Sequence, residues 1–368
     1  MIRWAIWGTG AISHRVAKDL RAVPGASLEA IGSRALETAR GFALSYGIPK
    51  FYAGLNSLLE DGAVDVVYVG APAHRHCDDA LAVLGAGKAV LCEKPFAINA
   101  AQAQRMVSCA RERGLFCMEA MWTRFIPAIV EAKRYIDEDH IGQIRLVIGN
   151  FTYPASRTQQ QHLFDVNQAG GALLDRGVYL ISLAHHLLGP PRSVRASACI
   201  GTTGVDEQSG YQLAWESGAL ADLCSSLIVR ATNDFIIAGD RGWIRILDPF
   251  YCAHELFVGA SGRVAIDTGP TDIGGAGRRV ITAAANSRWA RGFRRWIGFP
   301  LPVNRGGTRR RLPFCGYGYQ FELREVTRCL QEGKTESVIM PLGASVEVMQ
   351  TLDKLRHQLG ITYPQERT

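Results

Sequence analysis

The chain has 368 residues, more than one hydrophobic core usually supports, so we expect two domains. Hydrophobic residues make up 47% and charged residues 20%, proportions that exclude intrinsic disorder as the main state. The 41 basic and 34 acidic side chains give a net charge of +7, which favours anionic ligands but does not by itself indicate binding of nucleic acid.

The cysteine pattern and the N-terminal segment bear on the cellular compartment in which the protein resides. Nine cysteines are dispersed along the chain, without the spacing of a zinc site or a disulfide framework, so we expect reduced thiols and no metal. A glycine turn at Gly8 leaves no room for an apolar signal segment, and no later apolar run is long enough to span a bilayer. These features predict a cytoplasmic protein without a membrane partner.

Short apolar runs alternate with amphipathic stretches in the first third of the chain, which is typical of βαβ units and a parallel sheet. The expected strands are 2–7, 27–33, 64–69, 89–92 and 115–119. The expected helices are 11–23, 35–46, 77–86 and 100–113. We therefore predict an α/β, doubly wound Rossmann domain over residues 1–120.

From Ile144 onward, extended stretches separated by short turns predict a mostly antiparallel sheet. The expected strands are 144–153, 193–200, 210–216, 219–227, 234–238 and 243–247. The expected helices are 171–188, 320–332 and 342–360. We therefore predict a second domain of the α+β class, with an open, mostly antiparallel sheet, over residues 121–368.

Residues 272–312 are rich in glycine and arginine and contribute more than the whole net positive charge. We favour a solvated, mobile insertion in the second domain. The alternatives are an anion-binding lid over a phosphorylated or carboxylated substrate and a contact with an acidic partner.

A glycine turn lies between the first expected strand and the first expected helix, with the sequence Gly8-Thr9-Gly10-Ala11-Ile12-Ser13. Gly8 permits the tight turn, and Gly10 lets the backbone approach a pyrophosphate, which the N–H groups at the helix start can bind. Ser13 replaces the third glycine of the G-x-G-x-x-G pattern and is still small. The segment predicts dinucleotide binding, and an incidental glycine turn is the alternative.

The end of the second strand decides between NAD and NADP. An acidic residue there would bind the ribose 2′-hydroxyl of NAD, but the sequence has Ser33 and Arg34. A hydroxyl and a guanidinium can bind a 2′-phosphate. We predict NADP as the cofactor, with NAD possible if Arg34 only faces solvent.

Two more segments follow strands at the carboxyl edge of the parallel sheet, where ligands bind in such folds. One contains Pro72, His74 and His76, and the other is Glu93-Lys94-Pro95. Lys94 can donate to the nicotinamide ribose and to a substrate hydroxyl, and its charge can lower the pKa of a neighbouring acid. We expect Pro72, His76 and Glu93 at the cofactor site, and we favour loop capping or cofactor packing over catalysis for both histidines.

The helix expected at 171–188 carries Asp175 and Tyr179, four residues apart and on one face. Hydrogen bonding of this face into the domain interface would explain both residues. With Lys94 nearby, however, the pKa of the phenol, ordinarily about 10, could fall far enough for Tyr179 to exchange the proton in alcohol–ketone interconversion.

Three of these segments, residues 8–13, 93–95 and 170–179, together with Gly316-Tyr317-Gly318-Tyr319-Gln320-Phe321-Glu322, resemble the glucose–fructose oxidoreductase/inositol dehydrogenase (Gfo/Idh/MocA) family over nearly the whole chain. Residues 118–125, 340–342 and 363–366 are most similar to the dimeric dihydrodiol dehydrogenase branch, whose members are NADP-dependent and also oxidise aldopyranoses such as xylose. The resemblance implies that Lys94 and Tyr179 are the catalytic pair and that Asp175 orients the substrate. It also implies pocket-lining candidates, namely Trp122, Arg124 and Phe151, and face-to-face packing of the second sheet in a homodimer.

The sequence therefore predicts an NADP-dependent oxidoreductase that transfers a hydride between the nicotinamide and a carbinol carbon of a sugar, cyclitol or vicinal diol. One alternative is a reductase of an anionic or nucleotide-linked ketosugar, bound through the arginines of the insertion. Another is a non-catalytic NADP-binding sensor or partner protein, because a fold alone does not establish catalysis.

Overall fold

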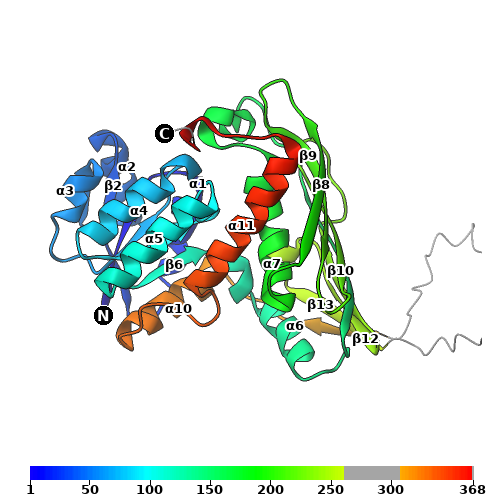
Figure 1. Cartoon of the computed structure of the whole chain (residues 1–368). Helices are drawn as coiled ribbons and strands as arrows, with labels where there is room; N and C mark the ends of the chain where they lie inside the picture. The colour runs from blue at the N-terminus through cyan, green and yellow to red at the C-terminus, as the bar shows by residue number, and fades with distance from the viewer. Residues whose placement is uncertain (261–306, 367–368) are drawn as a thin grey trace, which may run out of the picture.

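Two β-sheets, each with its own helices, lie side by side in the computed structural model, which describes residues 1–260 and 307–366 (Figure 1). The first sheet has six strands in the order β3-β2-β1-β4-β5-β6, and every pairing is parallel. Its strands are β1 (Ile2–Trp7), β2 (Ala26–Ser33), β3 (Lys50–Ala53), β4 (Val66–Val69), β5 (Ala89–Glu93) and β6 (Cys117–Ala120). The strand order reverses between β1 and β4, which is where ligands bind in doubly wound folds.

Helices cover both faces of this first sheet (Figure 1). They are α1 (Ala11–Leu20), α2 (Leu36–Tyr46), α3 (Leu55–Leu59), α4 (His76–Gly85) and α5 (Ala100–Arg113). The strand β4 is wholly buried, as expected for a parallel sheet with two covered faces. The predicted Rossmann sheet is confirmed, while the short pair β3 and α3 was not predicted.

The second sheet has eight strands in the order β14-β13-β12-β11-β7-β10-β9-β8. They are β7 (Ile144–Thr152), β8 (Ser193–Ile200), β9 (Asp206–Ala214), β10 (Leu220–Ser226), β11 (Phe235–Gly239), β12 (Gly242–Ile246), β13 (Glu255–Ala260) and β14 (Gly307–Arg311). Only the pairing of β7 with β10 is parallel among the described strands. The predicted open, mostly antiparallel sheet is confirmed.

The Arg- and Gly-rich insertion predicted at 272–312 falls mostly outside the described residues, which resume at 307. Its described end is not a mobile loop, because Gly307–Arg311 pair with β13 as the edge strand β14. On β13, Glu255 forms ion pairs with Arg309 and Arg311. Residues 308–311 are exposed, so this end is a solvated edge strand in which Arg309 and Arg311 share one carboxylate.

One face of the second sheet carries helices, and the opposite face carries none among the described residues (Figure 1). The helices are α6 (Pro127–Asp137), α7 (Val178–Leu188) and α11 (Leu342–Leu359), and a π-helical turn, η5 (Leu173–Gly177), leads directly into α7. The long helix α11 packs on α7 and β8 on one side and on α5 of the first domain on the other. It therefore connects the two halves of the molecule.

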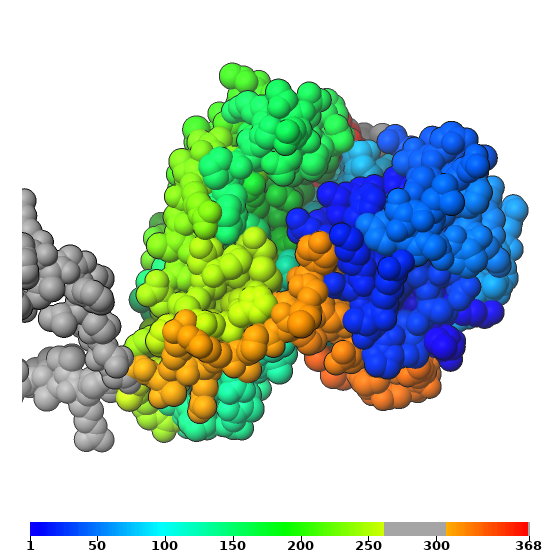
Figure 2. All heavy atoms as spheres, turned by 180° about the vertical axis from the view of Figure 1, so that it is seen from behind, coloured from blue at the N-terminus to red at the C-terminus, as the bar shows by residue number. Residues whose placement is uncertain are grey.

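The chain also returns to the nucleotide domain just before α11. Figure 2 shows the orange segment that follows β14 crossing the surface between the second domain and the blue nucleotide domain. Asp19 of α1 accepts hydrogen bonds from the N–H groups of Tyr317 and Tyr319 at 3.0 Å, which fixes the start of α10 (Tyr319–Gln331). Thus a helix within the predicted second domain packs on the first.

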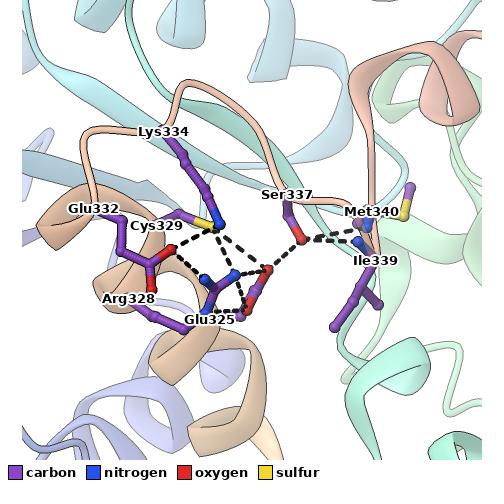
Figure 3. A network of polar contacts seen from close by, with 8 residues as sticks. All are labelled: Glu325, Arg328, Cys329, Glu332, Lys334, Ser337, Ile339 and Met340. Atoms are coloured by element: carbon purple, nitrogen blue, oxygen red, sulfur yellow. Dashed lines mark hydrogen bonds and ion pairs between the residues drawn. The ribbon is translucent and has the colours of Figure 1, made fainter.

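A polar network fastens the loop between α10 and α11 (Figure 3). Glu325 accepts a hydrogen bond from the Ser337 hydroxyl at 2.6 Å and pairs with Arg328 at 3.0 Å. The Ser337 oxygen accepts from the N–H of Ile339 at 3.1 Å. These contacts hold the loop to α10, and the N–H of Cys117 in β6 donates to the carbonyl of Thr335 in the same loop at 3.1 Å. No helix in the described parts of the chain is both long and apolar enough to cross a membrane.

Candidate active site

The turn between β1 and α1 is shaped for a close approach of a ligand to the backbone. Gly8 has a φ of +105°, and a Cβ there would lie 2.6 Å from the carbonyl oxygen of Gly70, so a side chain does not fit. At Gly10 a Cβ would meet nothing within 4 Å. Because no side chain caps the start of α1, its first N–H groups are available to a phosphate.

The remaining residues predicted for this turn lie where a dinucleotide would pass. Thr9, Ala11 and Ile12 are exposed or half-buried on the turn and at the helix start. Ser13 is buried, and its hydroxyl would lie 2.8 Å from a Cβ placed at Gly70. A small residue is therefore required at this third position of the motif, and the turn fits a pyrophosphate.

Ser33 and Arg34 lie where β2 leads into α2, at the edge of the sheet that carries the glycine turn. Ser33 is half-buried and Arg34 is exposed. Within the part of the chain that the structure describes, the guanidinium of Arg34 makes no ion pair. The Ser33 hydroxyl and the Arg34 guanidinium are therefore available to a phosphate group at this edge.

Two loops at the same edge are joined by His76. The ring is buried, with Nδ1 2.8 Å from the carbonyl oxygen of Pro95 and Nε2 2.8 Å from that of Ala71. Burial lowers its pKa. Both ring nitrogens face backbone oxygens, so His76 holds the loop after β4 to the loop after β5, whereas Pro72 remains exposed at the start of the short helix η1 (Ala73–Arg75).

Glu93, the last residue of β5, lies inside the fold beneath Lys94. One carboxylate oxygen accepts from the hydroxyl of Tyr68 at 2.6 Å, and the other accepts from the N–H of Lys94 at 3.1 Å. Burial raises the pKa of Glu93, although the charge of Lys94 opposes this shift. Glu93 therefore fixes the backbone from which the Lys94 side chain extends.

Lys94, Asp175 and Tyr179 come together from the two halves of the molecule. The Lys94 ammonium lies 2.9 Å from Asp175 Oδ1 and 3.0 Å from the carbonyl oxygen of the same residue. It also lies 5.0 Å from the centroid of the Tyr179 ring. Asp175 belongs to the π-helical turn and Tyr179 to the first turn of α7, and single π-turns of this kind are frequent at functional sites.

The environment of the Tyr179 hydroxyl keeps it neutral. Burial raises the pKa of Tyr179 well above its usual value, and the charge of Glu93 adds to the shift. The indole N–H of Trp122 donates to the hydroxyl at 3.1 Å and opposes the shift. The expectation that Lys94 lowers this pKa was wrong for this structure, because the ammonium lies over the ring and is paired with Asp175.

Asp175 stays ionised between two cations. Burial disfavours its charged form, but Lys94 and Arg176 outweigh this effect and lower its pKa. The Arg176 Nε atom lies 3.5 Å from Asp175 Oδ2, and its guanidinium also donates to the backbone carbonyls of Tyr153 and Ser226. Arg176 was not predicted, since nothing in the sequence shows that those two strand ends meet it.

Aromatic side chains surround Tyr179. The ring centroid of Phe151 lies 5.1 Å from that of Tyr179, and Tyr251 stacks on Phe151 at 4.4 Å. Trp122 stacks on Tyr319 at 4.5 Å. Tyr251 and Tyr319 were not predicted at the site, because the first belongs to a single short turn, η6 (Phe250–Cys252), and the second to a helix that reaches the site only through the fold.

Arg124, predicted beside Trp122, is used inside the protein. It is 2% exposed, and it donates to the hydroxyl of Ser182 at 3.0 Å and to the carbonyl of Ser182 at 2.9 Å. A third contact reaches the carbonyl of Ile339 at 3.4 Å. The guanidinium joins the short helix η2 (Trp122–Phe125) to α7 and to the loop before α11.

Within residues 1–260 and 307–366, no cluster of His, Cys, Asp and Glu could hold a metal ion.

Known proteins with similar sequences and structures cover the whole chain. Residues 2–121 match the family described as an oxidoreductase family with an NAD-binding Rossmann fold, and residues 129–245 match the Gfo/Idh/MocA C-terminal domain. Trans-1,2-dihydrobenzene-1,2-diol dehydrogenase of Sus scrofa is 32% identical over 371 residues, covering 100% of this chain and 99% of that protein. The protein of the same name from Danio rerio is also 32% identical and covers 99% of each chain.

Two solved structures share the fold. KijD10, a 3-ketoreductase from Actinomadura kijaniata in complex with NADP and TDP-benzene, superposes with a TM-score of 0.78 at 25% identity, covering 97% of this chain and 98% of that chain. Levoglucosan dehydrogenase in complex with NADH and levoglucosan superposes with a TM-score of 0.79 at 20% identity, covering 99% of each chain.

The open space at Gly10 yields a test of the phosphate site. In Gly10→Ala the added methyl group meets no protein atom, so the melting temperature should stay close to that of the wild type. The methyl group would stand where a pyrophosphate approaches the backbone, so we expect the dissociation constant for NADPH, measured by fluorescence titration, to rise about tenfold or more. Gly85→Ala in α4, where a Cβ is equally unhindered, should bind as the wild type does. Equal affinities in the two variants would place the phosphate elsewhere.

Proposed function

The chain belongs to the Gfo/Idh/MocA oxidoreductase family, and from this premise we propose that it transfers a hydride between NADP(H) and a carbinol carbon of a sugar, cyclitol or vicinal diol. The observation that carries the proposal is the convergence of Lys94, Asp175 and Tyr179 at the carboxyl edge of the parallel sheet. The nicotinamide, when bound, supplies or accepts the hydride. The side chains of this site supply orientation and the proton.

The three side chains take separate roles. Tyr179, whose phenol is neutral, gives its proton to the substrate oxygen during reduction and takes it back during oxidation. Two of the three N–H groups of the Lys94 ammonium donate to Asp175, and the third would donate to the nicotinamide ribose or to the reacting oxygen. Asp175, ionised between Lys94 and Arg176, accepts from a second hydroxyl of the substrate and so orients it. The aromatic rings beside Tyr179 provide an apolar wall for the carbon skeleton.

A second candidate is the reduction of a nucleotide-linked ketosugar. It is favoured by the structural likeness to KijD10, which was crystallised with TDP-benzene. Seven of the ten arginines in the predicted insertion at 272–312 lie outside the described residues, and the other three are on β14. Comparing turnover of nucleotide sugars with that of their neutral counterparts separates the two candidates. A sensor without catalysis is disfavoured, because it would not need the three converging side chains.

We propose NADP as the preferred cofactor. Support comes from Ser33 and the exposed Arg34 at the end of β2, where no carboxylate stands to bind a ribose 2′-hydroxyl. A guanidinium forms strong hydrogen bonds with phosphate, whereas NAD presents only hydroxyl groups there.

We further propose that the bare face of the second sheet packs on the same face of a second copy. Exposed apolar side chains lie on this face, among them Ile148, which is 41% exposed, and Leu220. A hollow of about 550 Å³ crosses strands β7 to β10 on the same face. The hollow is lined by polar residues such as Arg195, Gln212 and Asp222 as well as by Ile148, and sheet faces with exposed apolar side chains commonly form interfaces between copies.

We also place the protein in the cytoplasm. All nine cysteines lie in the described residues, and all are free thiols. Reduced cysteines are typical of that compartment. Most of these thiols lie wholly or partly inside the fold, and burial raises the pKa of Cys77 to about 11, which keeps it unreactive.

Removing the phenolic hydroxyl tests the main proposal. With a panel of pentoses, hexoses, cyclitols and vicinal diols, NADPH formation identifies a substrate of the wild-type protein. We expect Tyr179→Phe to lower kcat by about 100-fold or more while NADPH still binds, because only the proton donor is lost. Lys94→Ala should lower kcat and also weaken cofactor binding. Tyr52→Phe, which removes a hydroxyl bonded to Asp61 in the nucleotide domain, should keep the wild-type rate. Wild-type turnover in Tyr179→Phe would show that another group exchanges the proton.

The pH profile gives a second measure of the same role. Because the pKa of Tyr179 is raised, the phenol stays protonated at neutral pH, so kcat/KM for ketone reduction should be level over about pH 6–9. Oxidation needs the phenolate, whose fraction rises about tenfold per pH unit below the pKa, so kcat/KM for oxidation should rise with pH. A level oxidation profile would contradict this assignment.

The cofactor preference is tested at Arg34. We expect Arg34→Ala to raise KM for NADP by about 10-fold to 100-fold, as loss of a charged hydrogen bond implies, and to leave KM for NAD unchanged. Arg192→Ala, at an exposed arginine of the second domain that pairs with Glu216, serves as the control. A parallel change in both KM values would show that Arg34 does not contact the 2′-phosphate.

The dimer face is tested by placing a charge on it. We expect Ile148→Asp to sediment as a monomer, because an interface buries the new carboxylate without a partner. Leu44→Asp introduces the same change at a side chain of α2 that is 76% exposed, and it should sediment as the wild type does. A wild-type protein that is itself monomeric, or a dimer in both variants, would rule out this face.

A further inference from the structure

The start of the helix that carries Asp175 and Tyr179 is held by two side chains from distant parts of the chain. Asp206, the first residue of β9, accepts a hydrogen bond from the N–H of Leu173 at 2.8 Å. Tyr363, near the C-terminus, donates its hydroxyl hydrogen to the carbonyl of Gly170 at 2.8 Å. Both side chains are fully buried. The turn before the π-helix is therefore fixed at an N–H and at a carbonyl.

Tyr363 is itself held within the tail that follows α11. The Glu366 carboxylate, in η7 (Pro364–Glu366), accepts from both terminal nitrogens of Arg356, at 2.7 and 2.6 Å, and from the N–H of Tyr363 at 2.9 Å. The Arg356 guanidinium lies 4.8 Å from the centroid of the Tyr363 ring. The ring, the backbone N–H and the hydroxyl of Tyr363 are thus each contacted, and these contacts hold the hydroxyl at Gly170.

The same tail contacts the nucleotide domain. Asn99 donates its amide hydrogen to Glu366 at 3.1 Å, while its amide oxygen caps α5 by accepting from Gln102 at 2.8 Å. Next to it, the N–H of Ala100 donates to Asp353 of α11 at 2.8 Å. In Figure 1 the tail runs from the end of α11 toward the nucleotide domain. The start of α5, the tail and Gly170 therefore form one continuous series of polar contacts.

We propose that this tail is an interdomain strut in which Tyr363 is a positioning residue. Through Gly170 it fixes the helix that carries Asp175 and Tyr179, and through Glu366 and Asn99 it sets that helix relative to the domain that carries Lys94. The catalytic consequence rests on the proposed function of those three side chains. The Lys94–Asp175 distance of 2.9 Å depends on the placement of both domains, and a displacement of about 1 Å at a catalytic site can lower the rate 100-fold.

The test removes one hydroxyl and keeps the ring. We expect Tyr363→Phe to increase amide hydrogen exchange over residues 170–179 in the cofactor-free protein, because the Gly170 carbonyl loses its partner. For a substrate found in the polyol panel, kcat should fall about tenfold, with KM for NADP unchanged, because positioning affects the reaction step more than cofactor binding. The control is Tyr135→Phe on α6, which removes a hydroxyl that accepts a hydrogen bond from Arg310 at 2.9 Å. It should change neither the amide hydrogen exchange over residues 170–179 nor kcat.

A second pair of variants tests the contacts that join the C-terminal tail to the nucleotide domain, rather than the Tyr363 hydroxyl. Glu366→Ala should lower kcat as Tyr363→Phe does, and the double variant should be no slower than the slower single variant, since both act through one series of contacts. Glu332→Ala, which removes the exposed carboxylate paired with Arg328 and Lys334 in Figure 3, is the matched control.

The outcomes separate this inference from the proposed function. If the wild-type protein turns over no polyol, the proposed function fails, and the exchange measurement still decides whether Tyr363 holds the helix. Unchanged exchange over 170–179 in Tyr363→Phe overturns the strut. Faster exchange with an unchanged kcat overturns the positioning role, because the helix would then be held without effect on the reaction.

Discussion

The ion pair between Lys94 and Asp175 is the interaction on which the site depends. It joins the loop after β5 to the π-helical turn of the second domain, and its side chains are only 14% and 29% exposed. Charges buried to this extent are unfavourable unless each is paired and hydrogen-bonded, and removing one partner leaves the other uncompensated. The two domains are therefore constrained to meet in an arrangement that keeps these groups in contact. Arg176 adds to this constraint, because it pairs with the same carboxylate while it is bound to the ends of β7 and β10.

The same ion pair explains the protonation of Tyr179. A lysine near a phenol lowers the pKa only when its charge is near the oxygen and is not already neutralised. Here the ammonium lies over the ring and is paired with Asp175, while burial and Glu93 both favour the neutral phenol. In this site Tyr179 is therefore protonated, and Asp175 is ionised. Two acids in one site with opposite protonation states match the distinct tasks proposed for them, proton exchange and hydroxyl orientation.

Chain order alone placed the turn at Gly8 and the loop at Lys94 at one edge, because parallel strands bring their carboxyl ends together. Asp175 and Tyr179 follow no parallel strand, and they were predicted from their spacing on one helix and from the resemblance to the family. Contacts that join distant segments could not be predicted, and Arg176, Tyr251 and Tyr363 belong to this class. The pKa of Tyr179 was predicted in the wrong direction because proximity in the fold does not show which partner takes up a charge. The short elements β3 and β13 were missed because they leave almost no periodic pattern.

The residues that hold the catalytic side chains are distinct from those that would contact a substrate. His76 contacts two backbone carbonyls and Glu93 a backbone N–H, so the Lys94 loop is fixed without using groups that face the pocket. On the opposite side, Asp206 and Tyr363 each contact the backbone at the start of the helix. Each hydrogen bond contributes only about 1 kcal/mol, but together they define the orientation of the reacting groups. Among the aromatic side chains, Trp122 donates a hydrogen bond to the Tyr179 hydroxyl, whereas Phe151 and Tyr251 contact Tyr179 through their rings. Changes at Phe151 or Tyr251 would therefore alter the apolar surroundings of the phenol first, because the hydrogen bonds that hold the Lys94 loop and the start of the helix to the backbone do not involve these two side chains.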